Sequence, residues 1–397
     1  MERRPTQGPQ AGRRFPAADE TFADPETGVR VRKLTDFAAH SNHLYFTNDG
    51  WYDDGRRLVF NSDRGGAHNL YEVTLESGAV TQLTDLPALD DSYAHFSRNA
   101  AVDAARRAVY FWYGERLVAL DLDSLTLDVL YETPDGFTYM GCHNSVTADG
   151  RYVCTSVREE VEADASGGRW HEGAAIWEAE PVTRILRVPI AGGEAEVVHE
   201  EATELSHTNA SPTNPDVITY AQEGPWDRTS QRIWGLNLDT GENWKIRPED
   251  DSEMLGHEFW LANGEDVGYH GRWPDGQPFF GITGYDNESR VEHPIPRAVF
   301  DHDGPRGHVN AHSREAVVSD GTPDDPYLFL WRRDGDGYDG PRRLARHGAS
   351  TFDFGRLHVH PRFSPDGEQV LFCSDRTEYA NLYLADVPEA GTLPPAE

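Results

Sequence analysis

A histidine-containing motif recurs along this chain, and this repetition constrains the fold more than any other feature of the sequence. Successive copies lie roughly 50 residues apart, and repeats of that length are typical of solenoids and propellers. The longer interval between the third and fourth copies contains an insertion. The recurring histidines are His43, His95, His143, His207, His257, His308 and the pair His358/His360. If the repeats close into a ring, these histidines converge on its axis.

The segments between the histidines share a pattern of short strands and tight turns. Residues 54–85, DGRRLVFNSDRGGAHNLYEVTLESGAVTQLTD, divide into three strands separated by SDRGG and ESG turns. The last unit, DGEQVLFCSDRTEYANLYLADV, repeats the SDR…NLY pattern but lacks the final strand. The N-terminal VRVRKLTD resembles that missing strand, so we expect residues 29–36 to complete the last unit.

This arrangement predicts an all-β fold, a seven-bladed β-propeller of four-stranded blades closed by the N-terminal strand. An open solenoid is the alternative, and it would not need that strand. We expect a disordered arm at 1–28, one propeller domain at 29–390 and a flexible tail at 391–397. The insertion at about 160–182 is predicted to form a surface loop or a short helix.

Charge and cysteine content limit the partners and the compartment. The formal net charge of −32 argues against nucleic acid and anionic membranes as partners. There is no apolar run long enough for a transmembrane helix, and the N-terminal arginine pairs precede no apolar segment of a secretory signal. Three irregularly spaced cysteines indicate a reducing compartment, so we expect a cytoplasmic protein. The acidity is either an organism-wide bias or an adaptation to a cationic partner, and an anionic substrate would need a locally positive site.

Three histidines form a candidate metal site. The sequence HVHP places His358 and His360 at i and i+2, on one side of an extended strand. With His308 from the neighbouring unit they would supply three imidazoles, which suit a divalent transition metal with open positions. The alternative is a histidine pair that bonds only to loop backbone. His302 and His312 are rival ligands.

The region from 207 to 260 is dense in polar and aromatic residues and supplies a second candidate site. Arg232 suits bidentate binding of a carboxylate, and His257 could act as a general base. His207 and Trp226, which follows a rigid Gly-Pro turn, are candidate substrate-binding residues. Alternatively, Arg232 pairs with a blade acid and His257 caps a loop. We expect the HLYF and SDR motifs, and the earlier histidines, to be structural or channel-lining.

Several ordered motifs resemble the oligogalacturonate lyase family over residues 29–387. They are HLYFTNDG, SDRGGAHNLY, EGPW with QRIW, GHEFW, VVSDG and HVHPRFSPDGEQVLFCSD. The resemblance implies an intracellular, seven-bladed propeller lyase of pectin degradation. Such an enzyme cleaves short galacturonate oligomers by β-elimination, using a manganese-like divalent ion and a histidine base. The implied partner is a small anionic oligosaccharide.

Matched by motif, the resemblance assigns roles to particular residues. It implies that His257 is the base, that Arg232 binds substrate, and that His308, His358 and His360 bind the metal. The family's fourth ligand, a glutamine three residues before HxHP, is replaced by Gly355. Water, Asp353 or another blade would then complete the metal site. A lyase for a different uronate oligosaccharide and a non-catalytic interaction scaffold are the alternative functions.

Overall fold

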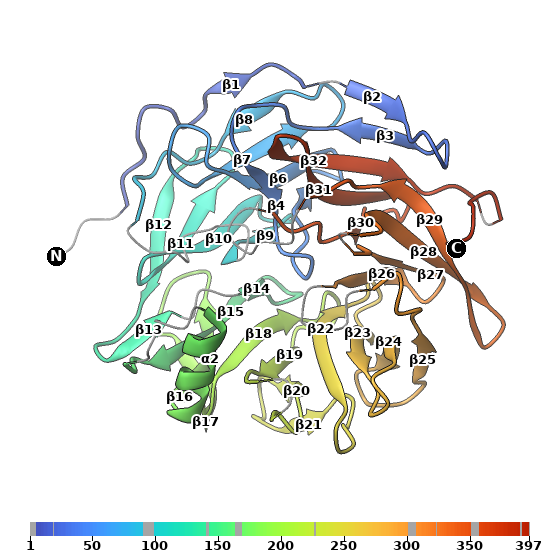
Figure 1. The fold of residues 1–397 in the computed structure, drawn as a ribbon. Coiled ribbons are helices and arrows are strands. Elements are labelled where there is room, and N and C mark those ends of the chain that lie inside the picture. Colours follow the sequence, from blue (N-terminus) through green and yellow to red (C-terminus); the bar gives the residue numbers. More distant parts are fainter. Residues whose placement is uncertain are drawn as a thin grey trace.

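Strands dominate this chain and are arranged as blades around a central axis (Figure 1). The computed structural model describes residues 5–18, 20–89, 99–139, 143–162, 169–225, 228–300, 307–322, 324–350, 357–389 and 391–396. Within these ranges the strands form seven sheets of antiparallel neighbours. The predicted seven-bladed, all-β propeller is therefore confirmed.

Blades 1 to 6 are built mainly from successive strands of the chain, and blade 7 combines the last three strands with one from the N-terminal part. Blade 1 contains β4 (Ser41–His43) and β5 (Trp51–Tyr52), then β6 (Arg57–Ser62), β7 (Asn69–Thr74) and β8 (Val80–Gln82). Blade 2 contains β9 (Ala101–Asp103), β10 (Ala108–Tyr113), β11 (Arg116–Asp121) and β12 (Leu127–Glu132). Blade 3 contains β13 (Phe137–Tyr139) and β14 (Ser145–Val146), then β15 (Tyr152–Glu159), β16 (Val182–Pro189) and β17 (Glu196–Ala202).

The remaining blades follow the same order. Blade 4 contains β18 (Leu205–Ala210), β19 (Val217–Gln222), β20 (Ile233–Asn237) and β21 (Asn243–Lys245). Blade 5 contains β22 (Met254–Trp260), β23 (Asp266–Arg272), β24 (Pro278–Gly284) and β25 (Val291–Pro294). Blade 6 contains β26 (Val309–Ser313), β27 (Ala316–Ser319), β28 (Tyr327–Asp334) and β29 (Gly337–Arg346). Blade 7 contains β30 (Arg362–Phe363), β31 (Gln369–Thr377), β32 (Tyr379–Asp386) and β3 (Arg30–Lys33).

Blade 7 closes the ring as the sequence predicts. Strand β3 pairs antiparallel with β32, with Val31 opposite Ala385 and Lys33 opposite Tyr383. The last blade therefore contains strands from both ends of the chain. This pairing excludes the open solenoid, in which the first and last repeats would not meet.

Both terminal segments are more ordered than the sequence indicates. We expected disorder for residues 1–28, but β1 (Arg14–Phe15) pairs with β8 and β2 (Glu20–Ala23) pairs with β3. The Phe15 ring also lies 6.3 Å from that of Tyr71. The predicted flexible tail likewise differs, because the Ala396 N–H donates to the Pro341 carbonyl. Composition missed these contacts because backbone hydrogen bonds to an exposed strand need no apolar pattern.

The central strands of most blades are apolar at consecutive positions because both of their faces pack against neighbouring blades. In β31, for example, Val370, Leu371, Phe372 and Cys373 are all buried. One cluster joins side chains of blades 1, 6 and 7, among them Phe60, Leu330 and Phe372. This packing holds the inner strands, and the loops that precede them, at fixed positions around the axis.

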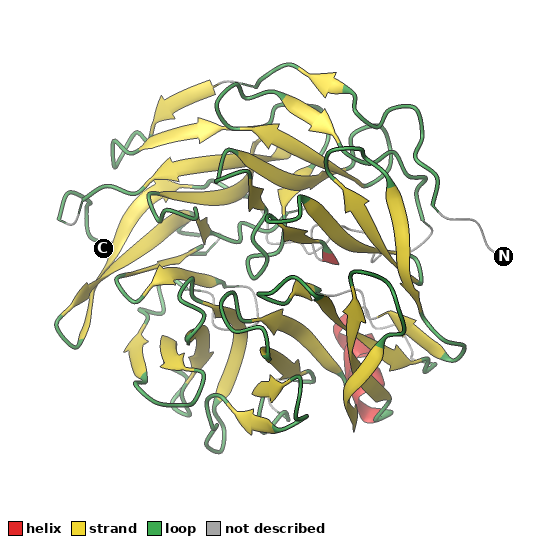
Figure 2. Cartoon of the chain, turned by 180° about the vertical axis from the view of Figure 1, so that it is seen from behind, coloured by secondary structure: helices red, strands yellow, loops and turns green. Residues whose placement is uncertain are grey.

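Within the described ranges, two connections between strands differ from the repeat. The insertion between β15 and β16 contains α2 (Arg169–Glu178), seen in red at the edge of the strand ring in Figure 2. Among the described residues, no helix has the length and apolar character that a membrane crossing requires. The other departure is the connection between β4 and β5, residues 44–50, which we call the channel segment. Its two aromatic residues contact side chains of blades across the ring.

Candidate active site

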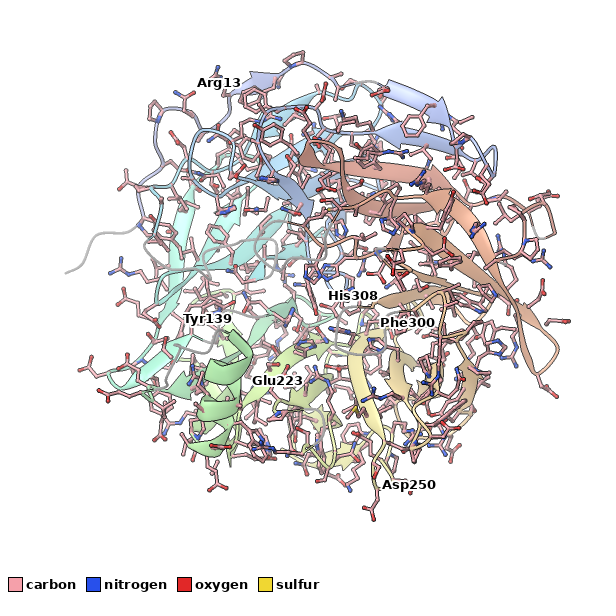
Figure 3. The ribbon with its side chains drawn as sticks, viewed as in Figure 1. Arg13, Tyr139, Glu223, Asp250, Phe300 and His308 are labelled. Atoms are coloured by element: carbon pink, nitrogen blue, oxygen red, sulfur yellow. The ribbon has the colours of Figure 1, made fainter. Side chains whose placement is uncertain are left out.

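Three buried histidines meet near the axis, where blades 6 and 7 adjoin (Figure 3 labels His308). Nε2 of His360 lies 2.7 Å from Nδ1 of His358 and 3.1 Å from Nε2 of His308. The sequence-predicted ligands are thus brought together. A neutral imidazole has one N–H donor and one nitrogen with a lone pair. Three such nitrogens that face one another cannot all be hydrogen-bonded, whereas one cation can accept the lone pairs of all three. The donor set therefore fits a transition metal.

A buried carboxylate orients one histidine of this triad. Oδ2 of Asp320 lies 2.8 Å from Nδ1 of His308, and its Oδ1 accepts the His308 backbone N–H at 2.8 Å. Carboxylates in this position fix the tautomer and the ring orientation of metal-binding histidines. Burial lowers the pKa of His308 to about 3, which keeps its imidazole neutral. Asp320 belongs to the VVSDG motif, but the sequence alone did not indicate its contact with His308.

The HVHP segment is not the extended strand that we predicted. Residues 357–361 are irregular, and β30 begins only at Arg362. His360 has a φ of 41°, a left-handed conformation that is uncommon for a non-glycine residue and often marks functional sites. Of the rival ligands, His312 packs against Gly367 and is not part of the triad. His302, Asp353 and Gly355 lie outside the described residues.

His257 lies beside the triad, and a β-bulge places it there. The register of β22 shifts between Gly256 and Phe259, and His257 has a φ of 51°. Its ring centroid is 4.4 Å from that of His308, and its Nδ1 is 2.6 Å from Nε2 of His270. Burial, reinforced by the neighbouring His308, holds the pKa of His257 well below its ordinary value. The alternative that His257 merely caps a loop is wrong.

Arg232 and His207 share two carboxylates on blades 4 and 5, the buried Glu258 and the partly exposed Glu223. The Arg232 guanidinium donates to Glu223 at 2.8 Å and to Glu258 at 3.2 Å. Nδ1 of His207 lies 3.0 Å from Glu258, and its Nε2 lies 3.5 Å from Glu223. Although desolvation opposes ionisation, the Arg232 charge holds the pKa of both carboxyls at about 2. We call these four residues the ion cluster.

The ion cluster tests the alternative that Arg232 pairs with an acid of the blade, and it includes a second β-bulge, at His207. Arg232 does pair with blade acids, as the structural interpretation expected, but it does so beside His207. His207 occupies a bulge of β18, between Ser206 and Asn209, with a φ of 52°. A β-bulge therefore changes the direction of the His207 and His257 side chains on the inner strands of adjacent blades. Trp226 lies outside the described residues.

The channel segment contributes two aromatic rings that contact both groups. The Tyr45 ring centroid is 4.1 Å from His143, 4.9 Å from His360 and 5.8 Å from His207. The Phe46 ring centroid is 5.6 Å from His308 and 5.9 Å from His257. Tyr45 and Phe46 are buried in a hydrophobic cluster, which agrees with the structural role expected of HLYF, and their rings lie between the triad and the ion cluster.

The earlier histidines differ in their surroundings. Nδ1 of His43 lies 2.5 Å from the Leu44 carbonyl oxygen, consistent with a structural role. His143, expected only to line the channel, lies against Tyr45 and His207. Its ring centroid is 4.1 Å from that of Tyr45 and 4.2 Å from that of His207. His95 lies outside the described residues.

Sequence reasoning missed Glu223, Glu258, Asp320, His270 and Tyr45. Four of them lie in motifs already singled out: Glu223 in EGPW, Glu258 in GHEFW, Asp320 in VVSDG and Tyr45 in HLYF. His270 lies in none of these motifs, and the pairing of β22 with β23 brings it beside His257.

Comparison with known proteins identifies a family and several similar proteins. A family model described as oligogalacturonate lyase matches residues 10–280. An oligogalacturonide lyase of Pectobacterium atrosepticum is 27% identical over 396 residues, covering 96% of this chain and 98% of that protein. An oligogalacturonate lyase of Dickeya dadantii is 25% identical with the same coverage. The fold matches a solved oligogalacturonate lyase in complex with manganese, with a TM-score of 0.83 at 24% identity, over 96% of this chain and 99% of that one.

Proposed function

Because this chain belongs to the oligogalacturonate lyase family and is therefore a lyase, we propose that it cleaves short galacturonate oligomers by β-elimination. The observation that carries this proposal is the buried histidine triad with His257 beside it, at a ring distance of 4.4 Å from His308. A metal-binding group and a candidate base thus face one small region of the axis. Neither a hydrolytic carboxylate pair nor a bound water is needed, because elimination consumes no water.

His257 would remove the proton at C5 of the uronate. That proton is weakly acidic while the neighbouring carboxylate keeps its full negative charge, so the site must neutralise the carboxylate. His308, His358 and His360 would hold a divalent ion such as Mn²⁺, which supplies positive charge to the carboxylate. Arg232, held by Glu223 and Glu258, would be a second group that binds the substrate carboxylate. Preorganised charge of this kind stabilises the enolate-like transition state.

The local environment of His257 suits the role of base. Its imidazole is buried, its Nδ1 faces His270, and its pKa is lowered. An unprotonated imidazole is thereby available to accept a proton at neutral pH. The product would carry a double bond between C4 and C5, and the C4 oxygen would leave with the second sugar.

A direct assay tests this function. The protein, supplied with Mn²⁺, is incubated with digalacturonate and trigalacturonate, and ultraviolet absorbance of the unsaturated uronate is followed. We expect the absorbance to rise, to fall to the background rate in His257→Gln, and to disappear with a chelator. The control is Asp339→Asn, because Asp339 is an exposed acid paired with Arg342 on blade 6. If the wild-type protein shows no absorbance change, the substrate assignment is wrong.

A second candidate is a lyase for a different uronate oligosaccharide, favoured by Gly355 at the position of the family's glutamine ligand. The same assay with guluronate, mannuronate and glucuronate oligomers separates the two. A larger kcat/KM on one of these than on digalacturonate would favour the second candidate.

A further inference from the structure

We propose that helix α2 is a positioning element of the active site, because its Trp177 holds the loop that begins with Glu223. This inference rests on the proposed function, in which Arg232 binds the substrate carboxylate. Glu223 accepts hydrogen bonds from Nη1 of Arg232 at 2.8 Å and from Nη2 at 3.3 Å. Two such bonds fix both the position and the direction of a guanidinium. Whatever fixes the Glu223 carboxylate therefore also fixes Arg232.

Glu223 is the first residue of the connection between β19 and β20, which we call the Glu223 loop (residues 223–232, described except 226 and 227). The start of this loop is held by blade 4. The Glu223 N–H donates to the Glu204 carbonyl at 2.8 Å, and the Ser206 hydroxyl donates to the Glu223 carboxylate at 2.5 Å. At Gly224 the chain leaves the sheet, so the position of the following residues depends on what packs against them.

Helix α2 packs directly against the Glu223 loop, and Figure 3 labels Glu223 beside the helix. A Cβ atom added at Gly224 would lie 2.5 Å from Cδ1 and from Nε1 of the Trp177 ring. It would also lie 2.7 Å from Oγ1 of Thr229. Real side chains do not approach so closely, so glycine is what lets the indole rest on the backbone here. The contact is therefore tight, and it lies one residue after Glu223.

A second contact between α2 and the Glu223 loop is exposed to solvent. Nη1 of Arg228 lies 2.8 Å from Oε1 of Glu178, and the Arg228 Cζ lies 5.9 Å from the Trp177 ring centroid. The Arg228 and Glu178 side chains are 49% and 61% exposed, so solvent screens their attraction. The N–H groups of Arg228 and Thr229 both donate to the Pro225 carbonyl, which makes this part of the loop a compact turn. We therefore assign most of the positioning to Trp177.

The two carboxylates that hold Arg232 differ in their support. Glu258 lies on the inner strand β22 and its side chain is 0% exposed, so the ring of blades fixes it. Glu223 begins a loop, and its side chain is 25% exposed. If the loop moved, Nη1 and Nη2 would lose their acceptor while Nε kept its bond to Glu258, and the guanidinium would turn. A misplacement of about 1 Å can lower the rate of a catalysed reaction about 100-fold.

A double-mutant cycle between Trp177 and Glu223 tests the proposal, with kcat/KM for digalacturonate as the measured quantity. We expect Trp177→Ala to lower kcat/KM about 10-fold or more. Trp177→Phe keeps a ring against Gly224 and should lie within about 3-fold of wild type. Glu223→Gln already weakens the link between the loop and Arg232, so Trp177→Ala should cost less than about 3-fold more in that background. If the two losses multiply, the helix does not act through Glu223.

Glu178→Gln is the matched control, because Glu178 lies on the same helix and contacts the same loop through an exposed pair. Its kcat/KM should remain within about 2-fold of wild type. Mn²⁺ affinity should be unchanged in Trp177→Ala, because the triad lies where blades 6 and 7 adjoin. A loss of Mn²⁺ affinity in that variant would mean that the whole site is disturbed, and it would overturn the assignment.

Hydrogen exchange gives a reading that needs no substrate. Trp177→Ala should accelerate exchange of the Arg228 and Thr229 amides, while β22, which carries Glu258, keeps its protection. Unchanged exchange at these two amides would show that α2 does not hold the loop. A wild-type protein that forms no unsaturated product from digalacturonate overturns the proposed function. An active wild type with unchanged exchange, or with losses that multiply, overturns the role of α2 alone.

Discussion

Replacing Glu258 with glutamine should destabilise the protein in a way that depends on pH. The Glu258 side chain is fully buried, with 0% exposure, and contacts Arg232 at 3.2 Å and His207 at 3.0 Å. At an effective dielectric constant of about 20, one charge pair at 3.2 Å is worth about 5 kcal/mol. Removing one partner of a buried pair costs about 3–5 kcal/mol in proteins. Because Glu223 still pairs with Arg232 in the variant, we expect the lower end, about 3 kcal/mol.

The lowered pKa leads to the same magnitude. A carboxyl with a pKa of about 2 in the folded protein, against 4.5 ordinarily, contributes about 3 kcal/mol at neutral pH. Because the folded pKa is depressed, this contribution is complete above about pH 4.5 and is lost as the pH falls towards 2. With an unfolding entropy of about 2 cal/mol/K per residue, about 3 kcal/mol lowers the Tm of this 397-residue chain by about 4 °C.

The assay is thermal unfolding of wild type and Glu258→Gln at pH 7 and at pH 3. The deficit in Tm should be about 4 °C at pH 7 and roughly half of that or less at pH 3. Glu223→Gln is the matched variant. The pKa of Glu223 is also held at about 2, but its side chain is 25% exposed, so solvent screens its charge and its deficit should be smaller. A Glu258→Gln deficit that is the same at both pH values, or smaller than that of Glu223→Gln, would refute the reasoning.

Three further predictions concern other parts of the molecule. Asp320→Asn should weaken Mn²⁺ binding about 10- to 100-fold, because the carboxylate orients His308; competition with a metal-binding dye measures this, and unchanged affinity would remove Asp320 from that role. Tyr45→Ala should lower the Tm by about 5 °C through the cavity left between His143 and His360, whereas Tyr45→Phe keeps the ring and should stay within about 2 °C; equal losses in both variants would show that the hydroxyl, not the ring, is what matters. Deleting residues 1–18 removes the strand that pairs with β8, so hydrogen exchange at Val80–Gln82 should accelerate while that of β31 does not; unchanged exchange at β8 would mean that the arm does not protect it.

The fold could be predicted from the sequence because repetition and alternation are local properties. The missing strand after NLYLADV and the matching VRVRKLTD even identified the closing pair, since a propeller needs every blade complete. The arm at 5–28 could not be predicted in the same way. Its strands β1 and β2 have only two and four residues, and they pair with β8 and β3 through backbone groups that leave no pattern in the sequence.

The site was only partly predictable for a similar reason. His308, His358 and His360 could be grouped because a repeat puts equivalent residues at one axis. The partners of the histidines in the site lie on neighbouring strands of the same blade, as His270 does for His257, or on the next blade, as Glu258 does for His207, and the spacing of these residues does not indicate the contacts. The bulges at His207 and His257 were also hidden, because a bulge adds one residue to a strand without interrupting its apolar pattern.

The pairing of Val31 with Ala385 has a consequence for how this protein is made. A ribosome releases β3 early, but its partner β32 emerges only after more than three hundred further residues. Throughout synthesis, β3 carries unpaired backbone groups on an edge that could recruit a strand from another chain. Closing so distant a pair is also slow, since its contact order is high. Nascent chains that stall before residue 379 therefore leave the edge of β3 unpaired. Aggregation during expression should be most severe for C-terminal truncations that remove β32.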